Sequence, residues 1–313
     1  MEAINNDIKE ILISNARLLE QNYNKQEKNT SINKIISELE QSIKHLFSLY
    51  ISTTKKIDID FINEVLFLQN TDGTKRINKP IFSVLRDNKT DMQGISFDGV
   101  HIKNHSFEGL QNVVINIDKV PEKDISTVKF TGVSVIGSLE CANVEGTNFK
   151  GCISKLGLNP QKVKNKSLKN TVLEGIEIIG EEIDLFQDVC IEGTNFIGVL
   201  GNPKINPQTV KSKSFLFTKL NGIELVGDYN QEDETYDLPC FDGCRLSVAD
   251  FTGAKGQIII NLQKISYQTI GSMRGKGITF IGSLKGIITD GTELVDCYHK
   301  ESDTEPAKKL VLR

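Results

Sequence analysis

Apolar residues recur at every fifth position over most of this chain. A period of five fits neither the 3.6-residue helix nor the two-residue strand, so it predicts a chain that turns a corner every five residues. Clear examples are Met92, Phe97, Ile102 and Phe107; Ile125, Phe130 and Val135; Leu168, Leu173 and Ile178; and Phe215, Leu220 and Leu225. A further set of ladders ends in Phe-x-Gly, at Phe149, Phe196 and Phe251, as the first ladder does at Phe107.

A longer repeat is superimposed on this pattern, because an asparagine stands sixteen residues before a Gly-x4-Gly frame five times. The asparagines are Asn78, Asn116, Asn159, Asn206 and Asn261, and the frames are Gly94/Gly99, Gly132/Gly137, Gly175/Gly180, Gly222/Gly227 and Gly277/Gly282. Self-similarity at a fixed offset, in units of unequal length, is typical of a solenoid built from one stacked supersecondary unit.

Several pentads resemble the pentapeptide-repeat family. In its pattern a small residue comes first, Asn or Asp comes second, and Leu or Phe comes third. The matching segments are Cys141-Ala-Asn-Val-Glu, Gly146-Thr-Asn-Phe-Lys, Gly193-Thr-Asn-Phe-Ile and Val248-Ala-Asp-Phe-Thr. The resemblance covers roughly residues 85 to 294 and implies a right-handed parallel β-helix with square coils of four pentads. It also implies that the large residue and the small residue two before it point inward. The small positions here are Ala142, Thr147, Thr194, Cys244 and Ala249. The family has unrelated roles, so the resemblance implies a fold rather than a function.

Each long unit also carries a segment such as Asn159-Pro-Gln or Asn206-Pro-Gln. Asparagine as an N-cap followed by proline is a helix-start signal, because the side-chain oxygen accepts a free N–H and proline has none to lose. Short helical turns are therefore expected along one edge of the solenoid, with an apolar residue four positions after each asparagine holding them to the coil. The five asparagines are interpreted as caps; the alternative is a ladder of binding groups.

The first 76 residues follow a helical period instead. Ile32, Ile36, Leu39, Ile43, Leu46 and Tyr50 form one amphipathic stripe, and Ile4, Ile8, Ile11, Leu12, Leu18 and Leu19 form another. A helical hairpin joined through residues 22–31 is expected. A third helix is expected over 61–68, with Asp58 or Asp60 as its cap. The hairpin would cap the apolar end of the solenoid; the alternative is a dimerising or partner-binding coiled coil. The expected regions are thus a helical domain over 1–76, a five-unit repeat over 77–294 and a polar tail over 295–313.

Composition and charge remove several functional classes. The 37 basic and 41 acidic residues are spread along the chain, so direct nucleic-acid binding is not expected. No secretory signal or membrane-spanning run is found, which predicts a bacterial cytoplasmic protein, or one delivered to a host cell without a Sec signal. The six cysteines follow no metal-ligand spacing and are expected to be buried free thiols. No catalytic, cofactor or metal site is predicted, and the protein is expected not to be an enzyme.

The longest insertion is the best candidate for an interaction site. It is expected to be a solvated acidic loop or a contact for a basic partner. Its candidate residues are Asp228, Tyr229, Glu232, Asp233, Glu234, Tyr236 and Asp237.

Three functions are compatible with this reading. The favoured one is a non-catalytic protein-interaction scaffold, acting as a bacterial effector or regulatory protein. There are two alternatives. One is a DNA mimic that binds topoisomerases, and the other is a substrate-binding module that resembles the β-helix of HECT-like bacterial ubiquitin-ligase effectors. A protein partner is expected, and a homodimer could form through the helices or the solenoid ends.

Overall fold

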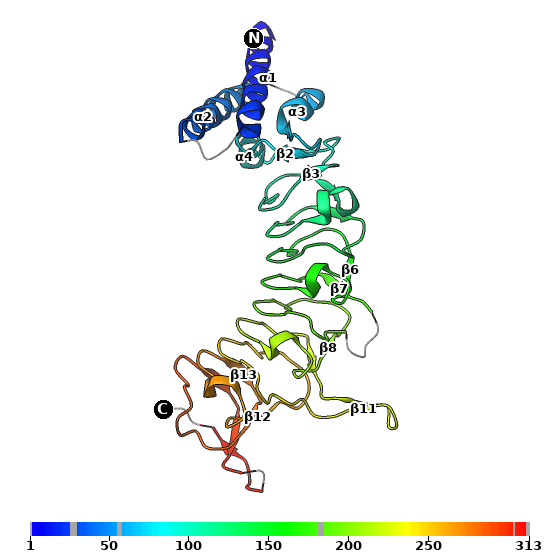
Figure 1. Cartoon of the computed structure of the whole chain (residues 1–313), viewed down its shortest axis with the longest axis vertical. Coiled ribbons are helices and arrows are strands. Elements are labelled where there is room, and N and C mark those ends of the chain that lie inside the picture. Colours follow the sequence, from blue (N-terminus) through cyan, green and yellow to red (C-terminus); the bar gives the residue numbers. More distant parts are fainter. Residues whose placement is uncertain (1, 26–29, 55–57, 181–184, 303, 311–313) are drawn as a thin grey trace. The chain divides into compact units, whose positions relative to one another are not determined.

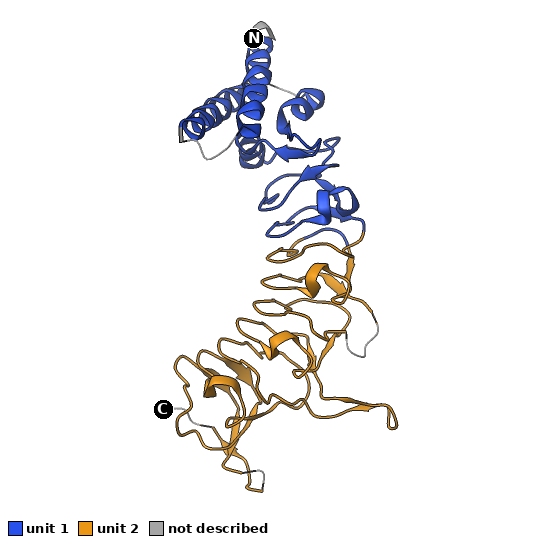
Figure 2. Cartoon of the chain, in the orientation of Figure 1, with its two compact units in different colours: residues 1–137, 152–154 blue, residues 138–151, 155–313 orange. Residues whose placement is uncertain are grey.

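The structure, a computed structural model, describes residues 2–25, 30–54, 58–180, 185–302 and 304–310. It divides into one unit of residues 1–137 and 152–154 and a second of residues 138–151 and 155–313 (Figure 2). Each unit carries turns of a β-solenoid, about nine in all, and the first unit also carries the N-terminal helices (Figure 1). The expected boundary at residue 76 falls inside the first unit. A helix over Lys79–Asp87 lies beyond it, so it does not divide the helices from the coils.

The helices of the first unit follow the predicted amphipathic stripes, with one correction. They are α1 (Glu2–Asn24), α2 (Thr30–Thr53), α3 (Ile59–Leu66) and α4 (Lys79–Asp87). Leu12, Leu19 and Phe47 are fully buried in this region. Ile11 and Leu18 were expected on the same stripe, but 48% and 45% of their surfaces are exposed. Successive helical residues point about 100° apart, so burying Leu12 and Leu19 turns their preceding neighbours toward solvent.

Helix α3 begins and ends two residues earlier than the period predicts. Asp58 is the N-cap, and its side chain accepts a hydrogen bond from the Phe61 N–H at 3.1 Å. The same carboxylate pairs with Lys9 at 2.6 Å, which ties the cap to α1. The chain leaves the helix at Phe67, where it enters a strand, so the expected helical residues 67 and 68 are extended.

Strands of the first unit are short and mostly parallel. They are β1 (Phe67–Gln69), β2 (Lys75–Ile77), β3 (Val100–His101), β4 (Val114–Asn116) and β5 (Ser134–Ile136). Strands β1 and β2 pair in antiparallel fashion, whereas β2–β3 and β4–β5 are parallel pairs from successive coils. Two 3-10 segments follow β4: η1 (Ile117–Lys119) and η2 (Pro121–Lys123).

In the second unit parallel pairing continues past residue 294, where the repeats were expected to end. Its strands are β6 (Leu156–Leu158), β7 (Ile176–Ile178), β8 (Lys204–Ile205), β9 (Glu224–Leu225), β10 (Tyr229–Asn230), β11 (Thr235–Tyr236), β12 (Ile259–Asn261), β13 (Arg274–Lys276), β14 (Thr279–Ile281), β15 (Glu293–Val295), β16 (Tyr298–Lys300) and β17 (Lys308–Lys309). Its 3-10 segments are η3 (Lys164–Lys166), η4 (Lys211–Lys213) and η5 (Ser266–Gln268). Parallel pairs β6–β7, β8–β9, β12–β14, β14–β16 and β13–β15 link successive coils. Strand β17 then returns antiparallel to β16.

The five-residue period corresponds to a recurring turn. At Leu168, for example, the carbonyl accepts from the Thr171 N–H at 3.0 Å, and Asn170 between them has φ +57°. An i to i+3 hydrogen bond with positive φ at the third position is the geometry of a type II turn. In most of these turns the first residue is apolar and points inward. Phe107, Phe149, Phe196 and Phe251 hold this position, with exposures of 0, 0, 0 and 1%.

Threonines at the small inward positions are accommodated by hydrogen bonds to the preceding coil. The hydroxyls of Thr171, Thr194 and Thr218 donate to main-chain carbonyls 26 or 27 residues earlier, at 2.7 to 2.9 Å. All three side chains have 0% exposure. A buried hydroxyl without a partner would be destabilising, so these bonds explain why threonine is tolerated inside the coil.

Candidate interaction site

The repeated asparagines act as caps in four of the five units. The side-chain oxygens of Asn116, Asn159, Asn206 and Asn261 accept from the N–H two residues later, at 2.9 to 3.1 Å. Asn78 differs, because its side chain makes no capping bond. It is fully buried, its Nδ2 donates to the Val65 carbonyl at 2.9 Å, and its Oδ1 has no hydrogen-bond partner.

Helical turns follow two of the five asparagines directly, because Asn78 precedes α4 and Asn116 caps η1. The expected row of such turns is wrong for the other three units. Only Asn78 precedes an α-helix, α4, which packs on α2 and α3. After Asn159 the chain makes a single turn, in which the Lys162 N–H donates to the Asn159 carbonyl at 3.0 Å, and the 3-10 segment η3 starts five residues later. Val163 between them is extended and 5% exposed. Burying this side chain takes the backbone out of helical geometry, and a helix this short has too little packing surface to resist.

Glutamines that follow the asparagines donate hydrogen bonds to main-chain carbonyls of the next coil. The sequence pattern did not predict these contacts. Gln161 Nε2 donates to the carbonyls of Leu185 and Gln187 at 3.0 and 2.8 Å. Gln208 Nε2 donates to those of Cys240 and Asp242 at 2.8 and 3.0 Å. The repeated Asn-Pro-Gln sequence was the signal from which these glutamine contacts could have been predicted. This edge therefore joins coils together, which favours the interpretation of the asparagines as caps over a binding ladder.

The long insertion is a β-hairpin rather than an irregular loop. Strands β10 and β11 pair Tyr229 with Tyr236 and Asn230 with Thr235, and the hairpin extends outward from its coil in the second unit (Figure 1). We call it the 228–237 hairpin. The two tyrosine rings lie 4.9 Å apart and are half-buried. A cross-strand aromatic pair of this kind contributes roughly 0.5–1 kcal/mol to the stability of a hairpin.

Several contacts attach the base of the 228–237 hairpin to the coil. The Gly227 N–H donates to the Asp237 carbonyl at 2.7 Å, and Asn206 Nδ2 donates to the Asp228 carboxylate at 2.8 Å. The Lys204 ammonium lies 4.7 Å from the Tyr236 ring centroid. A Cβ at Gly227 would lie 2.4 Å from the Leu238 carbonyl oxygen, so glycine is required where the two chains approach. A cavity of about 50 Å³, lined in part by Lys204, Asn206 and both tyrosines, lies at this base.

Acidic side chains gather at the free end of the hairpin. Glu232, Asp233 and Glu234 form its turn and are exposed, as are Asp228 and Asp237 at its base. Asn230 organises the turn, because its Oδ1 accepts from the Glu232 N–H at 2.9 Å and its Nδ2 donates to Asp233 at 3.0 Å. The structure thus brings all seven predicted residues into one hairpin, with the aromatic pair near the coil and three carboxylates at the tip.

The cysteines are free thiols, but the expectation that all are buried is wrong. Cys244 and Cys297 are buried, and burial raises the pKa of the Cys244 thiol to about 12. Cys141 and Cys240 are exposed. In the described part of the chain no group of three or more His, Cys, Asp or Glu side chains is placed to hold a metal ion.

These features define the class of protein as a β-solenoid with an N-terminal helical region, and the 228–237 hairpin projects from one of its coils. Comparison with known proteins found no matching family model, curated protein or solved structure. No helix within the described ranges combines the length and apolar content needed to span a bilayer.

Proposed function

We propose that this protein is a non-catalytic scaffold that binds a partner protein through the 228–237 hairpin. We further propose that its coils are right-handed and quadrilateral, of the pentapeptide-repeat type. The turn every five residues, with an inward large residue and an inward small residue, supports this coil geometry. A rigid stack of coils suits a scaffold because each coil contacts only its neighbours and leaves its outer surface available.

The observation that carries the proposal is the construction of the hairpin. Its base is held by the Asn206–Asp228 bond and the contact between the two tyrosine rings, whereas Glu232, Asp233 and Glu234 at its tip are all exposed. A short two-stranded hairpin is only marginally stable alone, so this anchoring pre-forms a surface that would otherwise lose entropy on binding. Pre-formed carboxylates at a tip suit a basic surface on the partner protein.

Charge neutralisation tests the proposal while keeping the hairpin folded. In the variant Glu232→Gln, Asp233→Asn, Glu234→Gln, the asparagine at 233 retains an acceptor for Asn230. Intact and variant proteins would be used to capture partners, and any partner identified would be purified and titrated by calorimetry at two salt concentrations. We expect the intact protein to bind more weakly at higher salt and the variant to lose at least tenfold in affinity.

A matched variant controls for net charge. Asp188→Asn, Glu301→Gln, Glu305→Gln removes three exposed carboxylates elsewhere in the second unit and should bind like the intact protein. Equal binding by the tip variant and the intact protein would refute the hairpin as the contact. A catalysed turnover of the captured partner would refute the non-catalytic role.

A further inference from the structure

One turn position in the second unit forms a column in which every residue has positive φ. Parallel bridges stack the residues two places further on, such as Asn195 with Lys219, Lys219 with Asp250, and Asp250 with Arg274. The column itself contains Gly146, Asn170, Gly193, Phe217, Val248, Ser272 and Gly291, with φ between +56° and +72°.

Two members of this column are chemically out of place. Phe217 and Val248 both have φ +59°, a conformation that glycine and asparagine adopt readily and that bulky or β-branched residues avoid. Their side chains are 59% and 39% exposed, so burial does not compensate for the unfavourable backbone. Both the backbone conformation and the exposure to solvent are unfavourable for these two residues, which lie side by side on successive coils. Their presence therefore points to a role other than folding.

These two side chains form one wall of a groove, which we call the corner groove. It has a volume of about 500 Å³, and it is lined by Phe217, Lys219, Val248, Asp250, Ser272 and Arg274. Each of three successive coils thus contributes a corner residue and, two positions later, a charged one. The charges alternate in sign from Lys219 to Asp250 to Arg274, and Arg274 is paired with Glu293 at 3.0 Å.

The spacing of these positions selects the shape of a ligand. Parallel coils repeat every ~4.8 Å, and one turn of an α-helix rises ~5.4 Å, so a helix lying along the column meets successive coils with successive turns. An extended peptide presents same-face side chains every ~6.6 Å and falls out of step within two coils. A nucleic-acid backbone would place uniform negative charge against Asp250 and would not suit alternating signs.

We propose that the corner groove binds an amphipathic helix of a partner protein. The helix places apolar side chains on Phe217 and Val248, an acidic residue opposite Lys219 and a basic residue opposite Asp250. This inference rests on the proposed scaffold function, but it uses a surface that shares no residue with the 228–237 hairpin.

The test is a selection followed by binding measurements on the full chain. A display library of helix-forming peptides about five turns long, randomised on one face, would be selected against the intact protein. We expect selected peptides to be helical when bound, by circular dichroism, and to lose at least tenfold in affinity for the double variant Phe217→Asn, Val248→Asn. Affinity lost with Lys219→Glu should return when the facing acidic residue of the peptide is changed to lysine.

Two controls separate the possible failures. The double variant should melt at or above the temperature of the intact protein, so that lost binding is not lost folding. The neutralised hairpin variant should bind the peptides normally, which keeps this result independent of the hairpin proposal. The proposal is overturned if no helical ligand is selected, if selected peptides bind the double variant equally well, or if the groove instead mediates self-association that the double variant abolishes.

Discussion

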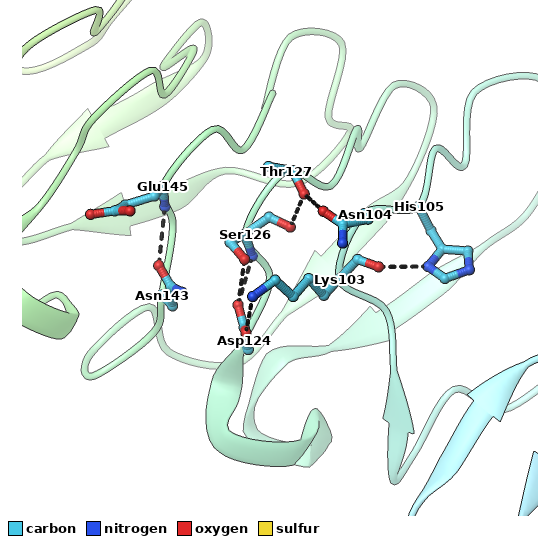
Figure 3. A network of polar contacts seen from close by, with 8 residues as sticks. All are labelled: Lys103, Asn104, His105, Asp124, Ser126, Thr127, Asn143 and Glu145. Carbon is cyan, nitrogen blue, oxygen red and sulfur yellow. Dashed lines mark hydrogen bonds and ion pairs between the residues drawn. The ribbon is translucent and has the colours of Figure 1, made fainter. Parts of the chain in front are cut away.

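Two turns in the first unit and two in the second fill the same backbone position with opposite chemistry. In the first unit Asn104 and Thr127 occupy the third position of successive turns, with φ +63° and +59°. Figure 3 shows the Thr127 hydroxyl donating to the Asn104 side-chain oxygen, so each polar side chain satisfies the other. In the second unit Phe217 and Val248 hold the third position of their turns, at φ +59°, with large exposed apolar surfaces.

The turns themselves are nearly identical in geometry. In each turn the N–H of the fourth residue donates to the carbonyl of the first residue. This distance is 3.2 Å in the turns of Asn104 and Thr127 and 3.1 Å in the turns of Phe217 and Val248. The coil therefore demands a left-handed backbone at this position and leaves the side chain undetermined. Asparagine satisfies that demand locally, whereas phenylalanine and valine do not. Thr127 is β-branched like Val248, but its hydroxyl is bonded to Asn104. The difference supports the proposal that a contact with a partner accounts for Phe217 and Val248.

The sharpest test contrasts two phenylalanines of the second unit. Phe196 is fully buried, so Phe196→Asp places an unpaired charge inside the coil and should lower the free energy of unfolding by more than ~4 kcal/mol. Phe217→Asp leaves the charge in solvent and should change that free energy by less than ~1 kcal/mol. Urea denaturation followed by circular dichroism measures both, with Phe149→Asp as a second buried site. Equal midpoints for Phe196→Asp and the intact protein would invalidate the assigned inward positions.

A valine introduced into the first unit should reproduce the strain inferred for the second. Asn104→Val loses both the residue suited to positive φ and the acceptor for Thr127, so we expect the free energy of unfolding to fall by ~2 kcal/mol. Asn104→Gly keeps the backbone preference and should be less damaging. The same urea melts compare the two variants. A valine variant as stable as the glycine variant would show that positive φ carries no penalty in this turn.

The opposite exchange should stabilise the second unit. Phe217→Asn and Val248→Asn each relieve an unfavourable backbone and should raise the free energy of unfolding by ~1 kcal/mol. Phe217→Leu, which keeps a large side chain at the same φ, serves as the control and should gain nothing. Thermal and urea melts record the change. Loss of stability in the asparagine variants would mean that Phe217 and Val248 support the fold, and that their presence needs no external contact.

A smaller difference concerns the pH dependence of stability, because the fourth residue of the turn at Asn104 is a histidine, His105. His105 Nδ1 lies 2.8 Å from the Lys103 carbonyl, its Nε2 is buried without a partner, and the Phe82 ring is 5.7 Å away. Burial lowers the pKa of His105, and the charge of Lys79 lowers it further, although two main-chain carbonyls oppose this. In the second unit the equivalent residues are Thr218 and Ala249, which do not titrate in this range.

The sign of the pH effect follows from proton linkage. With its pKa lower in the folded protein, His105 binds more protons when unfolded, so its contribution to stability is present above the unfolded pKa of ~6.5 and is lost as pH falls below it. Melting temperatures of the intact protein should therefore drop between about pH 7 and pH 5 more than those of His105→Gln. Parallel profiles for the two proteins would show that His105 does not contribute.

Local sequence signals predicted most of the architecture but less of the candidate site. A cap at Asp58 or Asp60 was predicted because capping depends on a few neighbouring residues, and Asp58 is the cap. Asn78 carries the same signal, yet it is buried against Val65 because helix packing around it overrides the cap. The hairpin was missed because β10 and β11 have two residues each, too few to show an alternating pattern. Gln161 and Gln208 were missed because their carbonyl partners lie 24 to 34 residues away in the sequence.

By itself the sequence determined that the chain turns every five residues, that large residues such as Phe196 point inward, and that the N-terminus is helical. Each of these features follows from the spacing of apolar residues, which depends only on residues close together in the chain. Only the tertiary structure decided that residues 228–237 form an anchored hairpin, and that Phe217 and Val248 line a groove with Lys219 and Asp250. Those neighbours come from different coils, and coil insertions of unequal length decide which residues meet.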